Sequence, residues 1–311
     1  MTASMGIALH PEHGASADDL LKNADIAMYH QKANGKDGYT FFSQAMLGPA
    51  TQDMVLEHDL RLALENGELE MYYQPQVAMG TQGITGVEAL MRWNHPQRGL
   101  LGAGEFLPQA EENGLIFPMT DWMIEAVCHD LCAWNARTST RMRMSINVSP
   151  QYLDRGHFSE KLQNALTRHG LSSSQFEVEI TENICIRNPL MAIEQLNRLS
   201  QLGVNIAIDD FGTGYSSLSY LHQFPIHTLK IDRAFVIGIH NEATPQPVVL
   251  AIISIAKGLG LQIVAEGVET LTQRNYLASA GCQTIQGFFY HRPMRQEKLL
   301  ALISPPVLLI L

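Results

Sequence analysis

The chain has 311 residues, of which 46% are hydrophobic, and its formal net charge of −10 comes from 21 Lys and Arg against 31 Asp and Glu. This length is normal for an α/β barrel with a short extension, and the apolar content suffices for a large core. The acidic balance argues against binding of a nucleic-acid polymer, which needs a basic surface. A nucleotide whose phosphates are neutralised by metal ions stays possible.

The four cysteines do not form a recognisable metal-binding pattern. Cys128 and Cys132 lie four residues apart in a helical stretch, and neither Cys185 nor Cys282 is placed to complete a site with them. We expect buried free thiols. No secretory signal is visible, and no apolar run approaches the roughly 20 residues of a membrane span. These features indicate a cytoplasmic chain without a membrane segment, although upstream regions could tether a longer protein to a membrane.

The first 45 residues read as a β-α-β fragment. Residues 5–10 and 39–42 have strand character, and Ser16 is suited to cap a helix that runs to about residue 33. Three such elements cannot bury a proper core alone. Residues 46–66 then predict a connecting helix, and residues 304–311 an apolar tail too short to span a membrane.

Residues 67–303 alternate between strand-like and helical patterns. The predicted strands are 69–77, 84–93, 142–148, 176–180, 204–208, 228–231, 262–265 and a short one near 284–285. The main predicted helices are 118–136, 157–169, 189–202, 246–259 and 270–280. Eight strands alternating with helices favour a (β/α)8 TIM-like barrel over a doubly wound open sheet. Dinucleotide binding has no support, since no G-x-G-x-x-G turn follows a strand.

Asp209 and Asp210 stand side by side at the end of the apolar strand 204–208. Two like charges this close repel, and one carboxyl would be driven toward protonation unless a cation compensates. A glycine-containing loop follows at once. The pair therefore suggests a divalent-metal site beside a loop, whereas a solvated turn is the simpler interpretation of an isolated Asp-Asp pair.

Polar side chains at the ends of the neighbouring strands favour the metal site. Active sites of (β/α)8 barrels lie at the carboxyl ends of the strands. Seven consecutive strands place polar residues there: Glu88 with Arg92, Asn147, Glu179, Asp209 with Asp210, Lys230, Glu266 with Glu269, and Gln286. Oxygen ligands, several of them anionic, suit Mg²⁺ or Mn²⁺ rather than Zn²⁺.

These residues sit in motifs that resemble one family in order and spacing. The motifs are Glu88-Ala89-Leu90 with Arg92-Trp93, Asn147, Glu179-Ile180-Thr181-Glu182, Asp209-Asp210-Phe211-Gly212, Leu229-Lys230-Ile231-Asp232 and Ala265-Glu266-Gly267-Val268-Glu269. From about residue 55 to 300 the chain resembles the EAL-domain phosphodiesterases. Residues 1–45 are similar to the C-terminal end of a GGDEF (diguanylate cyclase) domain, without its signature loop, so we expect no cyclase activity.

The resemblance implies an enzyme that hydrolyses cyclic di-GMP to linear pGpG. It further implies dependence on two Mg²⁺ or Mn²⁺ ions per site, inhibition by Ca²⁺, and a barrel whose first strand runs antiparallel. Carried over residue by residue, one metal would be held by Glu88, Asn147, Glu179 and Asp209. Asp209 would bridge to a second metal, held also by Asp210 and Glu266.

The resemblance also assigns roles around the metals. Lys230 would contact the attacking water, and with Glu88, Asp209 and Glu266 it completes the expected catalytic set. Gln74, Arg92, Gln286 and Glu269 would contact substrate, and Glu182 would anchor the loop after Asp210. That loop and its following helix would form a homodimer surface. Upstream GGDEF and sensory domains are expected in the full-length protein.

Two other functions compete with an active phosphodiesterase. Some EAL domains have lost metal ligands and only bind cyclic di-GMP as receptors. Here the expected ligands and Lys230 are all present, which favours turnover. An unrelated metal-dependent barrel enzyme, such as an aldolase, would share the fold but not the ordered motifs.

Overall fold

A computed structural model describes residues 4–33, 38–46, 49–138, 141–182, 189–213 and 224–303. The predictions made for Cys185 and for the tail at 304–311 lie outside these residues. Cys128 and Cys282 are buried free thiols, as expected, whereas the free thiol of Cys132 is exposed because its side chain lies on the outer face of its helix. The chain divides into two compact units, one of Met1–Leu69 with Trp93–Leu115 and the other of Glu70–Arg92 with Ile116–Leu311. In the described ranges, no helix combines the length and apolar character that a bilayer crossing requires.

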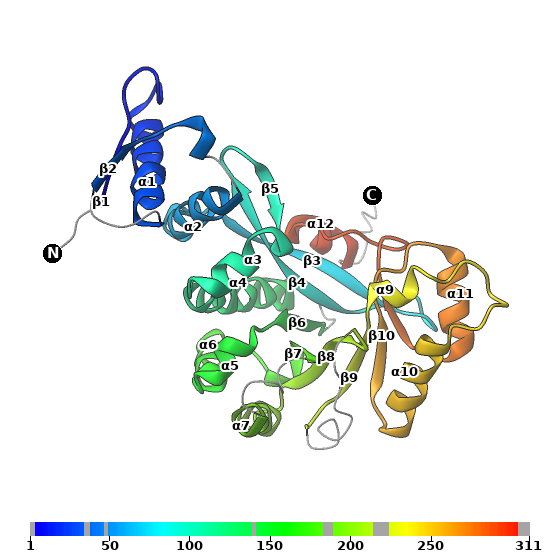
Figure 1. The fold of residues 1–311 in the computed structure, drawn as a ribbon. Helices are drawn as coiled ribbons and strands as arrows, with labels where there is room; N and C mark the ends of the chain where they lie inside the picture. Colours follow the sequence, from blue (N-terminus) through cyan, green and yellow to red (C-terminus); the bar gives the residue numbers. More distant parts are fainter. Residues whose placement is uncertain are drawn as a thin grey trace, which may run out of the picture. The chain divides into compact units, whose positions relative to one another are not determined.

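The first unit begins with the β-α-β fragment (Figure 1). Strands β1 (Ser4–Ile7) and β2 (Gly38–Phe41) pair in parallel, and helix α1 (Ala17–Ala33) connects them. A Cβ added at Gly6 would lie 1.8 Å from the carbonyl oxygen of Ala24, so β1 approaches α1 at a distance that only glycine allows. Ile26, Ala27 and Phe42 form the small core between them.

The rest of the first unit includes the connecting helix. It consists of η1 (Gln44–Met46), α2 (Pro49–Asn66), β5 (Gly99–Gly102) and α3 (Ala103–Glu112). Lys22 of α1 lies 3.6 Å from Asp59 of α2, and the buried His95 lies 3.3 Å from the same carboxylate. Lys22 therefore joins the fragment to α2, and His95 joins the end of β4 to the same helix. The predicted boundary between the fragment and the connecting helix at residue 45, and the one between that helix and the barrel at residue 66, stay predictions.

The second unit is a closed barrel, as predicted (Figure 1). Its eight strands in the described residues are β3 (Leu69–Ala78), β4 (Ile84–His95), β6 (Arg143–Asn147), β7 (Phe176–Thr181), β8 (Asn205–Phe211), β9 (Thr228–Ile231), β10 (Gln262–Ala265) and β11 (Thr284–Gln286). Pairing of β3 with β4 closes the sheet, and β3 runs antiparallel to β11, which confirms the expected direction of the first strand. The other neighbouring pairs around the barrel are parallel: β4 with β6, β6 with β7, β7 with β8, β8 with β9, β9 with β10 and β10 with β11. Their carboxyl ends therefore share one mouth of the barrel.

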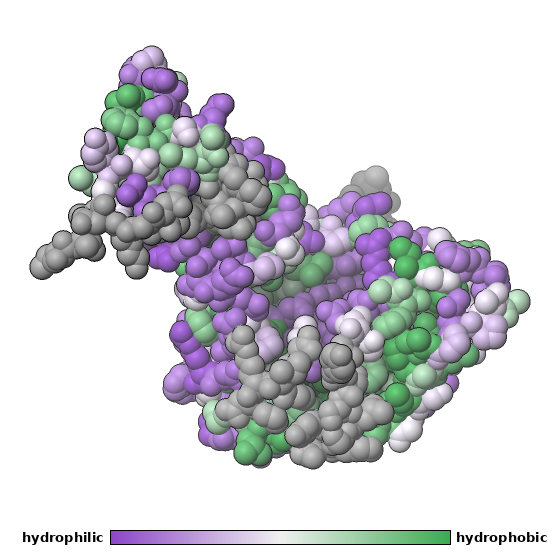
Figure 2. Space-filling model, viewed as in Figure 1, coloured by the Kyte–Doolittle hydropathy of each residue, from purple (hydrophilic) through white to green (hydrophobic). Residues whose placement is uncertain are grey.

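Helices surround this sheet and bury the outward faces of its strands. They are α4 (Ile116–Arg137), α5 (Pro150–Asp154), α6 (Phe158–His169), α7 (Pro189–Gln201), α9 (Arg233–Val236), α10 (Pro247–Gly258), α11 (Leu271–Ala280) and α12 (Gln296–Ile303), with η2 (Ser173–Gln175) before β7. Outward side chains such as Val178, Ile206 and Leu229 are fully buried. Figure 2 shows hydrophobic residues over α10, whereas hydrophilic residues surround the hollow beside β3 and α12.

Candidate metal centre

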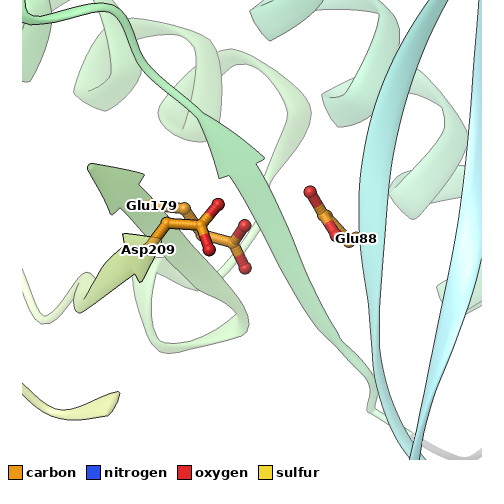
Figure 3. Close-up of side chains that lie close together, drawn as sticks. All are labelled: Glu88, Glu179 and Asp209. Carbon is orange, nitrogen blue, oxygen red and sulfur yellow. The ribbon is translucent and has the colours of Figure 1, made fainter. Parts of the chain in front are cut away.

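The interior of the barrel mouth holds one ammonium group among four carboxylates. Lys230 Nζ lies 2.5 Å from Glu179, 2.6 Å from Glu266, 3.3 Å from Asp209 and 3.8 Å from Glu88. Figure 3 shows the Glu179 and Asp209 carboxylates side by side, with Glu88 facing them from β4. Because five strands converge here, residues up to 178 positions apart in the sequence meet in one cluster.

A bulge brings the two neighbouring aspartates to the same site. In a regular strand, adjacent side chains point to opposite faces. The register between β8 and β9 shifts between Ile208 and Phe211, and Asp210 has φ of 54°, the left-handed conformation that Asp tolerates better than most residues. One carboxylate oxygen each from Asp209, Asp210 and Glu266 lies within 4.8 Å of the others. The local backbone thus turns a strand end into a paired acidic site.

Amide side chains orient Glu88 from both sides. Asn147 Nδ2 donates to Glu88 Oε1 at 2.6 Å, which leaves the amide oxygen of Asn147 available as a ligand. Gln286 Nε2 donates to Glu88 Oε2 and also to Gln74 Oε1, the second bond at 3.2 Å. Gln74 in turn donates to the backbone oxygen of His291 at 3.1 Å. The predicted ligands and two of the predicted substrate residues therefore belong to one network.

Burial and mutual repulsion raise the pKa values of carboxyl groups in this cluster, so the cluster favours a cation. Burial raises the pKa of Glu266 to about 8, with Lys230 opposing the shift and Asp209 adding to it. Burial and the neighbouring Asp209 raise the pKa of Asp210 to about 6. Burial also raises the pKa of Glu179 well above its ordinary value, although Lys230 opposes this. For Lys230, burial lowers the pKa, but the surrounding carboxylates outweigh it and raise the pKa above its ordinary value.

The donor set fits two hard divalent cations. Glu88, Glu179 and Asp209 each place an oxygen within 4.8 Å of the others, and Asp209 also belongs to the group with Asp210 and Glu266. Glu179 Oε1 is buried and accepts no hydrogen bond from the described residues. An orphaned carboxylate oxygen of this kind needs a cation or a donor. Oxygen ligands of this charge suit Mg²⁺ or Mn²⁺.

Three other predicted residues make contacts outside the acidic cluster. Glu182 Oε2 accepts a hydrogen bond from the backbone nitrogen of Gly212 at 3.1 Å, as expected for an anchor of the loop after Asp210. The Arg92 guanidinium lies over the ring of Tyr72. Glu269 is not brought into the acidic cluster: its Oε1 accepts from Arg233 at 2.9 Å, and the side chain is 40% exposed. Its substrate role stays a prediction.

Asp232 is a contributor that the sequence alone did not single out. Its side chain caps α9 by accepting from the nitrogen of Ala234 at 2.8 Å, and after burial and Asp209 its carboxylate also helps to raise the pKa of Asp210. Its position two residues after Lys230 was the available signal. That position did not identify Asp210 as the partner, because the bulge that aims Asp210 is invisible in the sequence.

The barrel and its acidic mouth match one described family. The family described as "EAL domain" matches residues 57–293, and "Diguanylate cyclase, GGDEF domain" matches residues 1–38. The first match covers most of the chain. The chain therefore belongs to the EAL-domain family and carries a GGDEF-type fragment at its N-terminal end.

Curated relatives and solved structures agree with this membership. Over 98% of its length the chain is 42% identical to the bifunctional diguanylate cyclase/cyclic di-GMP phosphodiesterase MucR of Pseudomonas aeruginosa, covering 44% of that protein. Over 94% it is 40% identical to the cyclic di-GMP phosphodiesterase NbdA of the same species, covering 38%. The chain thus spans less than half of either relative. A solved structure described as "PaMucR Phosphodiesterase, c-di-GMP complex" has a TM-score of 0.75 and 41% identity, with 78% of this chain and 99% of that one covered.

Proposed function

We propose that this chain is a metal-dependent phosphodiesterase that hydrolyses cyclic di-GMP to linear pGpG. The observation that carries the proposal is that two sets of three acidic residues have Asp209 in common and that the buried Lys230 contacts this residue. Family membership and the named activities of MucR and NbdA support the same substrate. The cyclic dinucleotide fits an acidic chain because the metals would neutralise most of the charge on the reacting phosphate.

Each of the two sets of acidic residues is proposed to hold one metal ion. Glu88, Asn147, Glu179 and Asp209 would hold one Mg²⁺ or Mn²⁺, and Asp209, Asp210 and Glu266 would hold the second. When bound, the two cations would lower the pKa of a shared water and neutralise charge on the phosphodiester. Ca²⁺ is expected to inhibit, since it prefers longer bonds and more ligands.

The chain's own side chains would position the reactants. Lys230 Nζ would orient the attacking water and hold a proton close to it. Arg92 and Gln74 would contact the substrate, with Arg92 on a phosphate oxygen, and Gln286 would keep Glu88 in place. Positioning and charge stabilisation of this kind account for most of the catalysis in phosphoryl transfer.

Two further parts of the proposal concern the assembly. The GGDEF-type fragment suggests a tandem with upstream GGDEF and sensory regions in the full-length protein. The loop after Asp210 and its following helix are proposed as a homodimer surface, and residues 214–223 of that surface lie outside the described ranges. A regulated dimer could then influence Asp210 through Gly212 and Glu182, whose hydrogen bond measures 3.1 Å.

A turnover assay with a metal series tests the function. Purified protein with Mn²⁺ or Mg²⁺ should convert cyclic di-GMP to pGpG, identified by chromatography and mass, and EDTA or Ca²⁺ should stop the reaction. Glu88→Ala should abolish turnover by removing a ligand, whereas Glu194→Ala on the exposed surface of α7 serves as the control. Tight binding of cyclic di-GMP by the wild type without any conversion would instead support the receptor alternative.

A further inference from the structure

A second arginine contacts the same aromatic ring as Arg92. We infer that Arg295 binds the phosphate of the dinucleotide that is not cleaved, and that Glu70 and Tyr72 hold it for this purpose. The inference rests on the proposed function for its ligand. It goes beyond that function by adding a specificity residue that neither the motifs nor the metal site assigns.

Tyr72 belongs to the row of side chains that leads into the metal centre. Alternate residues of a strand share one face, so Tyr72 of β3 lies on the face of Gln74, which contacts Gln286 at 3.2 Å. On β4, Arg92 is four residues after Glu88 and shares its face for the same reason. The Arg92 guanidinium carbon lies 5.7 Å from the centre of the Tyr72 ring.

Arg295 reaches the same ring from the segment before α12. Its guanidinium carbon also lies 5.7 Å from the centre of the Tyr72 ring. Its Nε and NH2 groups donate to the two carboxylate oxygens of Glu70 at 2.9 and 3.0 Å. This bidentate pair and the aromatic contact hold the guanidinium against β3. Two arginines thus contact one tyrosine on the strand that also carries Gln74.

The guanidinium of Arg295 retains donors for a ligand. Arginine has five N–H donors, of which Glu70 takes two, and the side chain is 56% exposed. The planar fork suits a phosphate better than an ammonium does. Tyr72 lies two residues along β3 from Gln74, a rise of roughly 7 Å. A dinucleotide with one phosphate at the metals extends over such a distance, so its second phosphate is the anion within reach of Arg295.

A thermodynamic cycle between protein and ligand tests this contact without relying on turnover. The ligands are pGpG and an analogue of pGpG whose internal phosphodiester is replaced by a neutral methylphosphonate. Both keep the 5′-phosphate that belongs at the metals. Dissociation constants would be measured by calorimetry with Mn²⁺ for the wild type, Arg295→Met and Arg295→Lys. Arg168→Met is the matched control, because Arg168 also makes a bidentate pair, with Glu125 on the outer helices.

We expect Arg295→Met to weaken pGpG binding about tenfold, the usual size of a lost charged hydrogen bond. The analogue should bind the wild type about tenfold more weakly than pGpG, and Arg295→Met should lower that ratio to about one. Arg295→Lys should fall between the two, and Arg168→Met should match the wild type. Equal weakening of both ligands by Arg295→Met, or no weakening of either, would overturn the assignment. Failure of the phosphodiesterase proposal would appear separately, as absent turnover of cyclic di-GMP.

Discussion

Lys230 Nζ lies 2.5 Å from Glu179 Oε2, and both side chains are completely buried. The ammonium supplies the counter-charge for a carboxylate that burial alone would keep protonated. Lys230 therefore has a stabilising role in addition to the catalytic role proposed for it. The two roles can be measured separately, because the stabilising role needs neither substrate nor metal.

Replacing Lys230 by Met should destabilise the metal-free protein. Leaving buried carboxylates without their cation costs about 3–5 kcal/mol of unfolding free energy, measurable by urea denaturation in EDTA. The double variant Lys230→Met with Glu179→Gln should recover a large part of this loss, since it removes the charge left unpaired. If the double variant is as unstable as the single one, the pair is not the source of the effect.

Metal affinity should rise with pH. The pKa of Glu266 is raised to about 8, mainly by burial, and that of Asp210 to about 6. Protons therefore compete with a cation for these oxygens. Mn²⁺ affinity, followed by calorimetry, should increase between about pH 6 and 8 with proton release on binding. An affinity that is independent of pH over this range would contradict the assignment of Glu266.

The same shift has the opposite consequence for stability in EDTA. The folded state holds the Glu266 proton up to about pH 8, whereas an unfolded chain releases it near the ordinary value of 4.5. Stability from this group is therefore present at low pH and is lost as the pH rises toward 8. Glu266→Gln should flatten the decline in melting temperature across this window, while Glu269→Gln, outside the cluster, should leave it unaltered.

Glu182→Gln should loosen the loop that begins at Gly212. The substitution removes the charge of an acceptor bonded to the Gly212 nitrogen at 3.1 Å. A charged hydrogen bond contributes about 1.5–3 kcal/mol, so Mn²⁺ affinity at the Asp210 site should fall roughly tenfold. Glu194→Gln is the surface control. Unchanged Mn²⁺ affinity in Glu182→Gln would show that the anchor does not set the position of Asp210.

Removal of residues 1–45 should leave the barrel folded. The fragment has its own small core of Ile26, Ala27 and Phe42, and it contacts the connecting helix through Lys22 and Asp59. The shortened chain should melt cooperatively at a slightly lower temperature, as recorded by circular dichroism. Loss of the cooperative transition would show that the fragment is needed for the barrel to fold.

The barrel was predictable from the sequence, whereas parts of the site were not. Alternating strand and helix patterns gave eight strands in the correct order, because each buried strand leaves a local apolar run. The short strand β5, the helix α3 with Pro108 inside it, and the one-turn helix α9 left no such pattern. Hairpin geometry and capping determine those elements instead.

Long-range pairs were also beyond the reach of local patterns. Glu70 and Arg295 are 225 residues apart, and Arg233 of α9 meets Glu269 of the loop after β10, 36 residues away. Adjacent aspartates on a regular strand would point to opposite faces, so the shared orientation of Asp209 and Asp210 required the bulge. The ordered motifs compensated for this, because they identified the residues even where the backbone geometry was unknown.

The central claim is that Asp209 joins two cation sites, and crystals soaked in Mn²⁺ test it most directly. Anomalous scattering should give two peaks that both contact Asp209, one also beside Glu88 and Glu179 and the other beside Asp210 and Glu266. Asp209→Asn crystals should lose at least one peak. A single peak in the wild type, or peaks that do not contact Asp209, would contradict the two-cation site.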